Sequence, residues 1–249
     1  MNIIILVKQT PDSTTKVKIG ADGKTLDASA VKFIVNPFDE YAIEEALQIK
    51  ERMGGEVTAL CLGPEGAATA LRSVLAMGVD KAIHIVAEDT VLDSHAVSLA
   101  LAQALKKMPY DLILMGKQAI DDYNEQVGPR LSALLDVPCI TYVAKAEIEE
   151  GKVTAHREVE GGIEVVECQL PAMLTVEKGI NEPRYASLKG IMMAKKKPIE
   201  TQSVDIEEVK LVTQTMAYPP ERPPGKIVGE GIEAVPELVR LLNEEAKVI

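Results

Sequence analysis

The sequence predicts an α/β protein built on a doubly wound, mostly parallel sheet, and two observations lead to this. Short apolar runs alternate regularly with amphipathic segments of helical period from residue 2 to residue 136. Glycine, proline or a polar loop ends the runs, as is typical of buried parallel strands. We therefore expect right-handed crossovers between the strands, and ligands beyond the carboxyl ends of the strands. Three loops are expected to converge there: Lys8-Gln9, Leu62-Gly63-Pro64 and Gly116 to Asn124.

The elements of this first part follow from local signals. Asn36 is a good N-cap and Pro37 suits the first helical position, while Gly54-Gly55 stops that helix. Asp93 or Ser94 should cap a later helix. In chain order, we expect a strand at 2–7, a polar loop at 8–12, a polar excursion with a small hairpin at 14–30, a helix from 37, a strand at 57–62, a helix from 65 to about 77, a strand at 82–86, a helix from 93 or 94, a strand at 112–115 and a helix from about 125.

After Pro138 the pattern changes. Residues 144–148, 153–158 and 163–170 are typical of an antiparallel meander, and 174–176 could return to the main sheet. The remainder is expected to hold a polar segment at 181–198, little periodicity at 199–235 and a helix from 235 to about 247. A tail of this kind rarely folds alone. We expect an α/β domain at 1–190, with its meander at about 142–170, and a C-terminal arm at 191–249 that lies on a partner.

Composition excludes several classes of protein. The net charge of −11 argues against nucleic acid or an anionic membrane as a partner, and the absence of Trp, with only two Phe, removes an aromatic stacking platform. Three widely spaced cysteines favour buried thiols in a reducing compartment. The N-terminus lacks the basic region of a signal peptide, and no apolar run is long enough to cross a bilayer. We expect a soluble, cytoplasmic protein with no direct membrane insertion.

Residues 111–129 (DLILMGKQAIDDYNEQVGP) form the expected ligand site. An apolar strand breaks at Gly116, and a polar loop leads to the start of a helix near Asn124. Backbone N–H groups after the glycine and at the helix start can hold a phosphate. Asp121 and Asp122 would repel phosphate, so they are expected to face ribose hydroxyls, cap the helix or accept backbone N–H groups. A capped loop without a ligand is the alternative.

No catalytic or metal motif accompanies this loop. His84, His95 and His156 are isolated, with no cysteine or acid at catalytic or metal-ligand spacing. A P-loop, a nucleophile elbow and a zinc motif are also missing. We therefore expect no catalytic residue and no metal, so that any chemistry would belong to a cofactor.

A set of short motifs is spread in order along nearly the whole chain. They are ILVKQ at 5–9 with the following aspartate, NPFDEYAIEEA at 36–46, LGP at 62–64, LAMGVD at 75–80, GKQAIDD at 116–122, RE at 157–158 with GG at 161–162, and NEPRYASL at 181–188 leading to AKKK at 194–197. Together these motifs resemble the beta (small) subunit family of electron transfer flavoproteins. The resemblance implies an adenine-nucleotide-binding, Rossmann-like fold and a heterodimer whose alpha subunit carries the redox-active FAD. It also implies electron transfer from acyl-CoA dehydrogenases of fatty acid beta-oxidation, or other dehydrogenases, to a quinone oxidoreductase or another acceptor.

By this match a nucleotide, AMP in most members, lies against the end of the first strand and three loops. The residues implied are Leu6, Asn36, Pro37, Phe38, Asp39, Leu62, Gly63, Gly116, Lys117, Gln118, Ala119, Ile120, Asp121, Asp122, Tyr123, Asn124, Glu125, Gln126 and Val127.

The nucleotide motif is mixed. Tyr123 replaces a further acidic residue of the AMP pattern, and residues 126–129 resemble the electron-bifurcating members, which hold a second FAD and oxidise NADH. Those members usually have glycine in place of Asp122. The GKQAIDD and NEPRYASLKG motifs favour AMP, with a second FAD as the alternative. A stand-alone nucleotide-binding or nucleotide-hydrolysing protein of the same fold is a further alternative, against which the unpatterned tail argues.

The resemblance also implies residues that dock partners. Leu188 would lie on an exposed loop and insert into a pocket of a dehydrogenase, although the pattern alone is typical of an ordinary apolar residue. Arg157 and Glu158 would lie at the interface near the alpha-subunit FAD, where the pattern alone indicates an exposed strand pair. The run Lys195-Lys196-Lys197 is either solvated or steers an acidic partner.

Overall fold

The computed structural model describes residues 1–87, 92–206, 209–222 and 224–249. Within these ranges the chain divides into two compact units, Met1–Gln214 and Thr215–Ile249. The expected division between residues 190 and 191 falls inside helix α5 (Leu188–Ala194). Residues 191–214 therefore lie in the first unit, which also contains the sheet.

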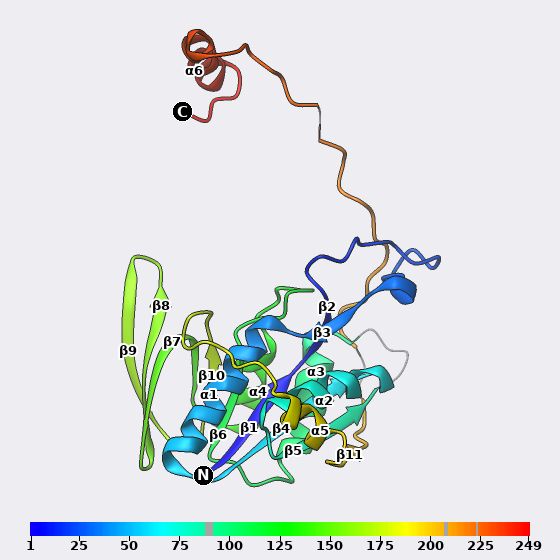
Figure 1. Cartoon of the computed structure of the whole chain (residues 1–249), viewed down its shortest axis with the longest axis vertical. Helices are drawn as coiled ribbons and strands as arrows, with labels where there is room; N and C mark the ends of the chain where they lie inside the picture. The colour runs from blue at the N-terminus through cyan, green and yellow to red at the C-terminus, as the bar shows by residue number, and fades with distance from the viewer. Residues whose placement is uncertain (88–91, 207–208, 223) are drawn as a thin grey trace. The chain divides into compact units, whose positions relative to one another are not determined.

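A nine-stranded sheet with the order β11-β5-β4-β1-β6-β10-β7-β8-β9 forms the centre of the first unit (Figure 1). Neighbouring strands are parallel from β11 to β7, and β8 and β9 continue the sheet as antiparallel strands. This confirms the predicted mostly parallel sheet with an antiparallel meander. The strands are β1 (Asn2–Val7), β4 (Glu56–Gly63), β5 (Lys81–Val86), β6 (Leu112–Gly116), β7 (Cys139–Glu149), β8 (Lys152–Val159), β9 (Gly162–Gln169), β10 (Ala172–Val176) and β11 (Ile199–Gln202).

The strand order reverses between β1 and β6. The chain proceeds from β1 to β4 and β5 on one side, and then crosses back to place β6 on the other side of β1. In sheets of this kind the loops that follow the strands on either side of such a reversal diverge, which leaves a crevice for a ligand. The loops after β1 and β6 flank this crevice.

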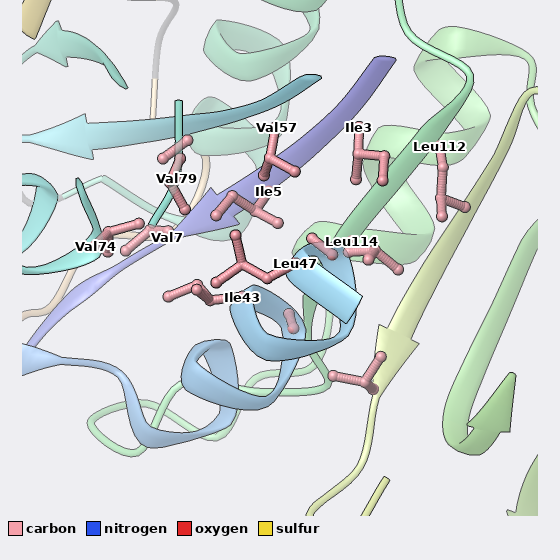
Figure 2. Close-up of a cluster of buried hydrophobic side chains, with 14 of the residues drawn as sticks. Ile3, Ile5, Val7, Ile43, Leu47, Val57, Val74, Val79, Leu112 and Leu114 are labelled. Carbon is pink, nitrogen blue, oxygen red and sulfur yellow. The ribbon is translucent and has the colours of Figure 1, made fainter. Parts of the chain in front are cut away.

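Helices cover both faces of the sheet, because successive side chains of β1 point to opposite sides. Ile5 shares one core cluster with Leu47, which lies on the helix α1 (Figure 2). Ile4 shares a second cluster with Leu105 of α3 and Leu131 of α4. The helices of this unit are α1 (Pro37–Met53), α2 (Ala68–Met77), α3 (Ser94–Leu105), α4 (Val127–Leu135) and α5, with 3-10 turns at Ala28–Ala30 and Glu65–Ala67.

Three expectations about local structure need correction. The polar loop expected after β1 holds the strand β2 (Gln9–Pro11), which pairs with β3 (Phe33–Val35) at the base of the excursion. The excursion itself contains a single bridge between Ile19 and Leu26 in place of a full hairpin. The helix expected from about residue 125 begins at Val127, because Tyr123 and Glu125 adopt left-handed backbone angles, with φ of 52° and 56°, that no α-helix contains.

Two elements were not predicted, because the sequence carries no clear signal for them. Helix α5 lies in the polar segment 181–198, and its apolar residues are largely exposed. Strand β11 extends the sheet edge beside β5, although residues 199–235 show little periodicity. It spans four residues and is partly exposed throughout, so burial imposes no apolar run on it.

The second unit contains a 3-10 turn (Ile232–Ala234) and helix α6 (Val235–Glu244), which ends three residues before the expected end near 247. Arg240 pairs with Glu237 and Glu244 on one side of this helix. Among the residues that the structure describes, no helix combines the length and apolar character needed to span a membrane.

Candidate functional site

A cavity of about 230 Å³ lies at the strand reversal, and the three loops expected to converge do meet there. Its walls come from the ends of β1 and β4, the start of α1, the start of α3, and the segment from β6 to α4. The predicted residues that line it are Leu6, Asn36, Asp39, Leu62, Gly63, Lys117, Gln118, Ala119, Asp122, Asn124, Glu125, Gln126 and Val127.

Six of the predicted residues do not line the cavity, and most of them support its walls instead. Phe38 lies under the Lys117 ammonium, 5.6 Å from the ring centroid. Tyr123 points into solvent with 62% of its side chain exposed. The six are Pro37, Phe38, Gly116, Ile120, Asp121 and Tyr123.

Helix α3 contributes a wall that the pattern did not assign to the site. Ser94, Val97 and Leu101 line the cavity, whereas the sequence suggested Ser94 only as one of two possible caps and gave the other two no place in the site. Asp93 is the cap, and its side chain accepts a hydrogen bond from the amide of Ala96. Val97 is only partly buried, and that exposure is visible only once the helix is placed on the sheet.

Asp39 joins the two strands that flank the reversal. Its buried carboxylate accepts hydrogen bonds from the backbone N–H of Lys8 at 2.8 Å and of Gly116 at 3.0 Å. Burial raises the pKa of Asp39 to about 7, although these two amides and Asn36 favour the charged form. The first turn of α1 is thereby tied to the ends of both β1 and β6.

Gly116 is required by a close approach of α1. A Cβ at this position would lie 2.5 Å from the Cβ of Phe38 and 2.6 Å from its carbonyl carbon. The amide of Gly116 is occupied by Asp39, and the next amide, of Lys117, donates to the carbonyl of Val176 at 2.9 Å. Neither amide is available to a ligand.

Among the residues that the structure describes, amides without an acceptor lie further along the loop, at the cavity-lining residues Gln118 and Ala119 and again at the start of α4. Arg130 is the first residue of this helix region whose amide reaches back, to the carbonyl of Gln126 at 3.0 Å. Within the described ranges, the amides of Gln126, Val127 and Gly128 have no acceptor. Unpaired amides at the start of a helix attract anions.

Asn36 occupies the N-cap position of α1 as predicted, but its side chain makes no cap hydrogen bond. Instead, its amide nitrogen donates to the carbonyl of Gln118 at 2.9 Å, and its oxygen accepts from the amide of Ile120 at 3.2 Å. Because Asn36 is buried, these bonds fix the first half of the cavity loop.

Lys8 neutralises the acidic pair at the cavity mouth. Its ammonium lies 2.7 Å from a carboxylate oxygen of Asp121 and 3.0 Å from one of Asp122. Burial opposes the charge of Lys8, but the two carboxylates outweigh it and raise the pKa of the lysine. Asp122 also accepts from the amide of Asn124 at 3.1 Å, one of the roles expected for it.

The six predicted docking residues lie away from the cavity lining. Leu188, at the start of α5, exposes 83% of its side chain. The preceding loop is fixed to α1, because Arg184 forms ion pairs with Glu44 at 2.7 Å and Glu51 at 2.6 Å. Gly190 lets α5 lie directly on α2, since a Cβ there would come within 2.3 Å of a backbone carbonyl of α2. Leu188 is thus an exposed side chain on a firmly held helix.

The remaining docking candidates differ in their exposure and in the contacts that their charged groups already make. Lys195 and Lys196 are exposed, but the ammonium of Lys197 donates to the carbonyl of Val79 at 2.6 Å and so has a structural contact. Arg157 on β8 is half-buried and donates to the Thr141 hydroxyl at 3.1 Å. Its neighbour Glu158 is exposed.

Within the described residues, no group of three or more His, Cys, Asp or Glu side chains is placed to hold a metal ion. Fold and cavity together define a doubly wound α/β protein with a ligand crevice at its strand reversal, a class in which nucleotide sites are common.

Comparisons with known proteins narrow this class. Residues 24–207 match the electron transfer flavoprotein domain. The chain is 46% identical over 259 residues to electron transfer flavoprotein subunit beta of Bacillus subtilis, covering 100% of both chains. It is 40% identical over 256 residues to the subunit beta of Bradyrhizobium diazoefficiens, again with 100% of both covered. With the subunit beta of Sus scrofa it shares 36% over 252 residues, covering 100% of this chain and 99% of that protein. The chain belongs to the electron transfer flavoprotein subunit beta family.

Proposed function

We propose that this chain is the beta subunit of a heterodimeric electron transfer flavoprotein and holds AMP as a structural nucleotide in the cavity. The observation that carries the proposal is the crevice at the strand reversal, in which three unpaired amides stand at the start of α4. An alpha subunit would hold FAD, which supplies the electron-transfer chemistry. The residues of this chain bind, orient and dock.

The cavity residues suit the parts of a mononucleotide. Amides at the start of α4 suit a phosphate, because they supply hydrogen-bond donors without a mobile counter-charge. The apolar side chains of Leu6, Leu62 and Val97 suit a purine base. Asp122 at the mouth offers an acceptor for ribose hydroxyls, while Lys8 balances its charge.

The bound cofactors test this proposal directly. The purified complex with the alpha subunit should release one FAD and one AMP per heterodimer when it is denatured, as measured by flavin absorbance and by chromatography of the supernatant. Two FAD and no AMP would instead support the alternative, a bifurcating type that oxidises NADH, which the sequence at residues 126–129 favours. A complex without adenine nucleotide would contradict both.

Whether the chain assembles with an alpha subunit tests the remaining alternative, a stand-alone nucleotide-binding protein. Size-exclusion chromatography of this chain alone and with the alpha subunit should show a heterodimer only in the mixture. A stable monomer that ignores the alpha subunit would support a stand-alone nucleotide-binding protein of the same fold.

We further propose that Leu188 docks acyl-CoA or other dehydrogenases, which pass electrons on to a quinone oxidoreductase or another acceptor. Leu188→Ala should raise the dehydrogenase concentration needed for half-maximal transfer about thirtyfold, because one buried apolar anchor often carries about 2 kcal/mol of binding free energy. Steady-state transfer rates at varied dehydrogenase measure this.

Met192→Ala is the matched control for docking, since Met192 is 68% exposed on the same helix. It should change transfer by less than Leu188→Ala, while both variants retain AMP and the alpha subunit. Equal effects of the two variants would indicate a diffuse apolar surface in place of a single anchor.

A further inference from the structure

Tyr142 lies where β7 leaves its regular pairing, close to the level at which β6 ends. The register against β10 shifts between Leu174 and Val176, across the stretch of β7 that holds Tyr142, and the register against β8 shifts just after it, between Val143 and Lys145. Tyr142 has a left-handed backbone with φ of 58°. Irregularities of this kind redirect a side chain, and they recur beside functional sites. Here the tyrosine side chain is directed to the cavity loop.

The hydroxyl of Tyr142 donates a hydrogen bond to the carboxylate of Glu125. Glu125 lines the cavity and directly precedes the unpaired amides at the start of α4. It too has a left-handed backbone, with φ of 56°. Asn36 fixes the first half of the loop through Gln118 and Ile120, so Tyr142 supplies the anchor for the second half.

The aromatic ring of Tyr142 is held independently of its hydroxyl. The ammonium of Lys117 lies 4.7 Å from the ring centroid, and it is itself held by an ion pair with Glu177 at 2.5 Å. A cation over an aromatic face stabilises the ring position. Removing only the hydroxyl therefore leaves the ring in place and breaks only the contact with the loop.

We propose that Tyr142 is a positioning residue for the nucleotide: by holding Glu125, it keeps residues 117–126 closed over the cavity and slows release of the nucleotide. The inference rests on the proposed AMP site. Non-glycine residues in the left-handed region carry a conformational cost, and the hydrogen bond between Tyr142 and Glu125 offsets that cost at both ends. Without the bond, the second half of the loop relaxes away from the cavity, and the amides that face the phosphate move with it.

The direct test is the release rate of radiolabelled AMP from the heterodimer, chased with excess unlabelled AMP. Tyr142→Phe should release AMP about tenfold faster than the unmodified protein, since a hydrogen bond to a charged acceptor is lost. AMP content at saturation should be unchanged. Tyr110→Phe is the matched control, because that half-buried tyrosine lies outside the cavity lining, and its release rate should equal that of the unmodified protein. Equal rates for Tyr142→Phe and the control would overturn the proposal.

A double-mutant cycle tests whether the two residues act through each other. Glu125→Ala alone should speed release, but it should add little when combined with Tyr142→Phe, because both changes remove the same contact. Additive effects of the two changes would show that they act separately and would contradict the proposal.

Amide hydrogen exchange of residues 119–126, measured after the nucleotide is removed, separates this inference from the proposed function. Faster exchange in Tyr142→Phe supports a hydroxyl that holds the loop, and unchanged exchange refutes it, whatever ligand the cavity takes. A heterodimer that binds no AMP would refute the proposed function alone.

Discussion

Gly116→Ala should lower the melting temperature of the complex by roughly 6–12 °C, the equivalent of about 3 kcal/mol in a chain of this size. The added Cβ would meet the Cβ of Phe38 at 2.5 Å and its carbonyl carbon at 2.6 Å. The carbonyl carbon belongs to the backbone of α1, so relief requires a shift of the helix and not of a flexible side chain. That shift would also break the hydrogen bond from the Gly116 amide to Asp39.

Gly66→Ala is the control for this prediction. Nothing lies within 4 Å of a Cβ built at Gly66, so its melting temperature should stay near that of the unmodified protein. The fall for Gly116→Ala should be accompanied by loss of AMP, because the loop that follows β6 lines the cavity. A normal melting temperature for Gly116→Ala would refute the close packing of α1 against Gly116 at the end of β6.

Asp39→Asn should destabilise the protein by about 1–3 kcal/mol at pH 5, because a buried backbone donor loses its acceptor. The two oxygens of Asp39 accept from the amides of Lys8 and Gly116, one each. With a pKa of about 7 the group is protonated at pH 5, but its hydroxyl oxygen still has a lone pair for an N–H donor. An asparagine offers one oxygen and turns an N–H₂ group, which cannot accept, towards the other donor. Thermal unfolding followed by circular dichroism measures the loss.

The deficit of Asp39→Asn should shrink as the pH rises from 5 to 8. The pKa of Asp39 is about 7 in the folded protein, above its ordinary value, so the folded state binds this proton more tightly than the unfolded state. Stability from this group is therefore present at low pH and is lost as the pH rises towards and through 7. The asparagine does not titrate, and so lacks this loss.

Asp136→Asn provides a control, since Asp136 is exposed and asparagine tolerates its left-handed φ of 55°. Its melting temperature should stay near that of the unmodified protein at both pH values. A deficit of Asp39→Asn that stays constant or grows between pH 5 and 8 would contradict the raised pKa of Asp39.

Because Asp39 contacts Gly116 directly, the losses of stability predicted for the two substitutions should not add in full when both are combined. Asp39 and Gly116 together hold the start of α1 against the ends of β1 and β6. This contact shapes the crevice, and other residues would face a ligand in it.

Much of the fold was predictable because it rests on local patterns. Residues 3–7 of β1 are buried on both faces of the sheet, so this run must be apolar throughout. Glycines at 54 and 55 end α1 where expected. The convergence of the loops after β1, β4 and β6 followed from parallel strands alone, because their carboxyl ends meet at one edge.

Long-range contacts could not be predicted from local sequence patterns, since the type of a residue does not reveal a partner dozens of positions away. Asn36 carries the signature of an N-cap, yet its side chain bonds to a loop 82 positions further along the chain. Gly116 resembles a phosphate-binding glycine, yet its amide is taken by Asp39, 77 positions earlier. Strand β11 has no apolar run, because an exposed edge strand needs none.

The amino-acid pattern was sufficient for the sheet apart from its edge strand β11, for the position of the crevice and for the family, since each depends on apolar periodicity or on motifs read in order. Packing alone decided which amides remain available to an anion and which side chains hold the loop. The amides of Gly116 and Lys117 are taken, whereas those of Gln118, Ala119 and residues 126–128 find no acceptor in the described part of the chain. Tyr142 reaches Glu125 only because β7 is irregular beside β10. A hydrogen-bond donor has one partner at a time, and the docking of distant elements determines which partner it finds.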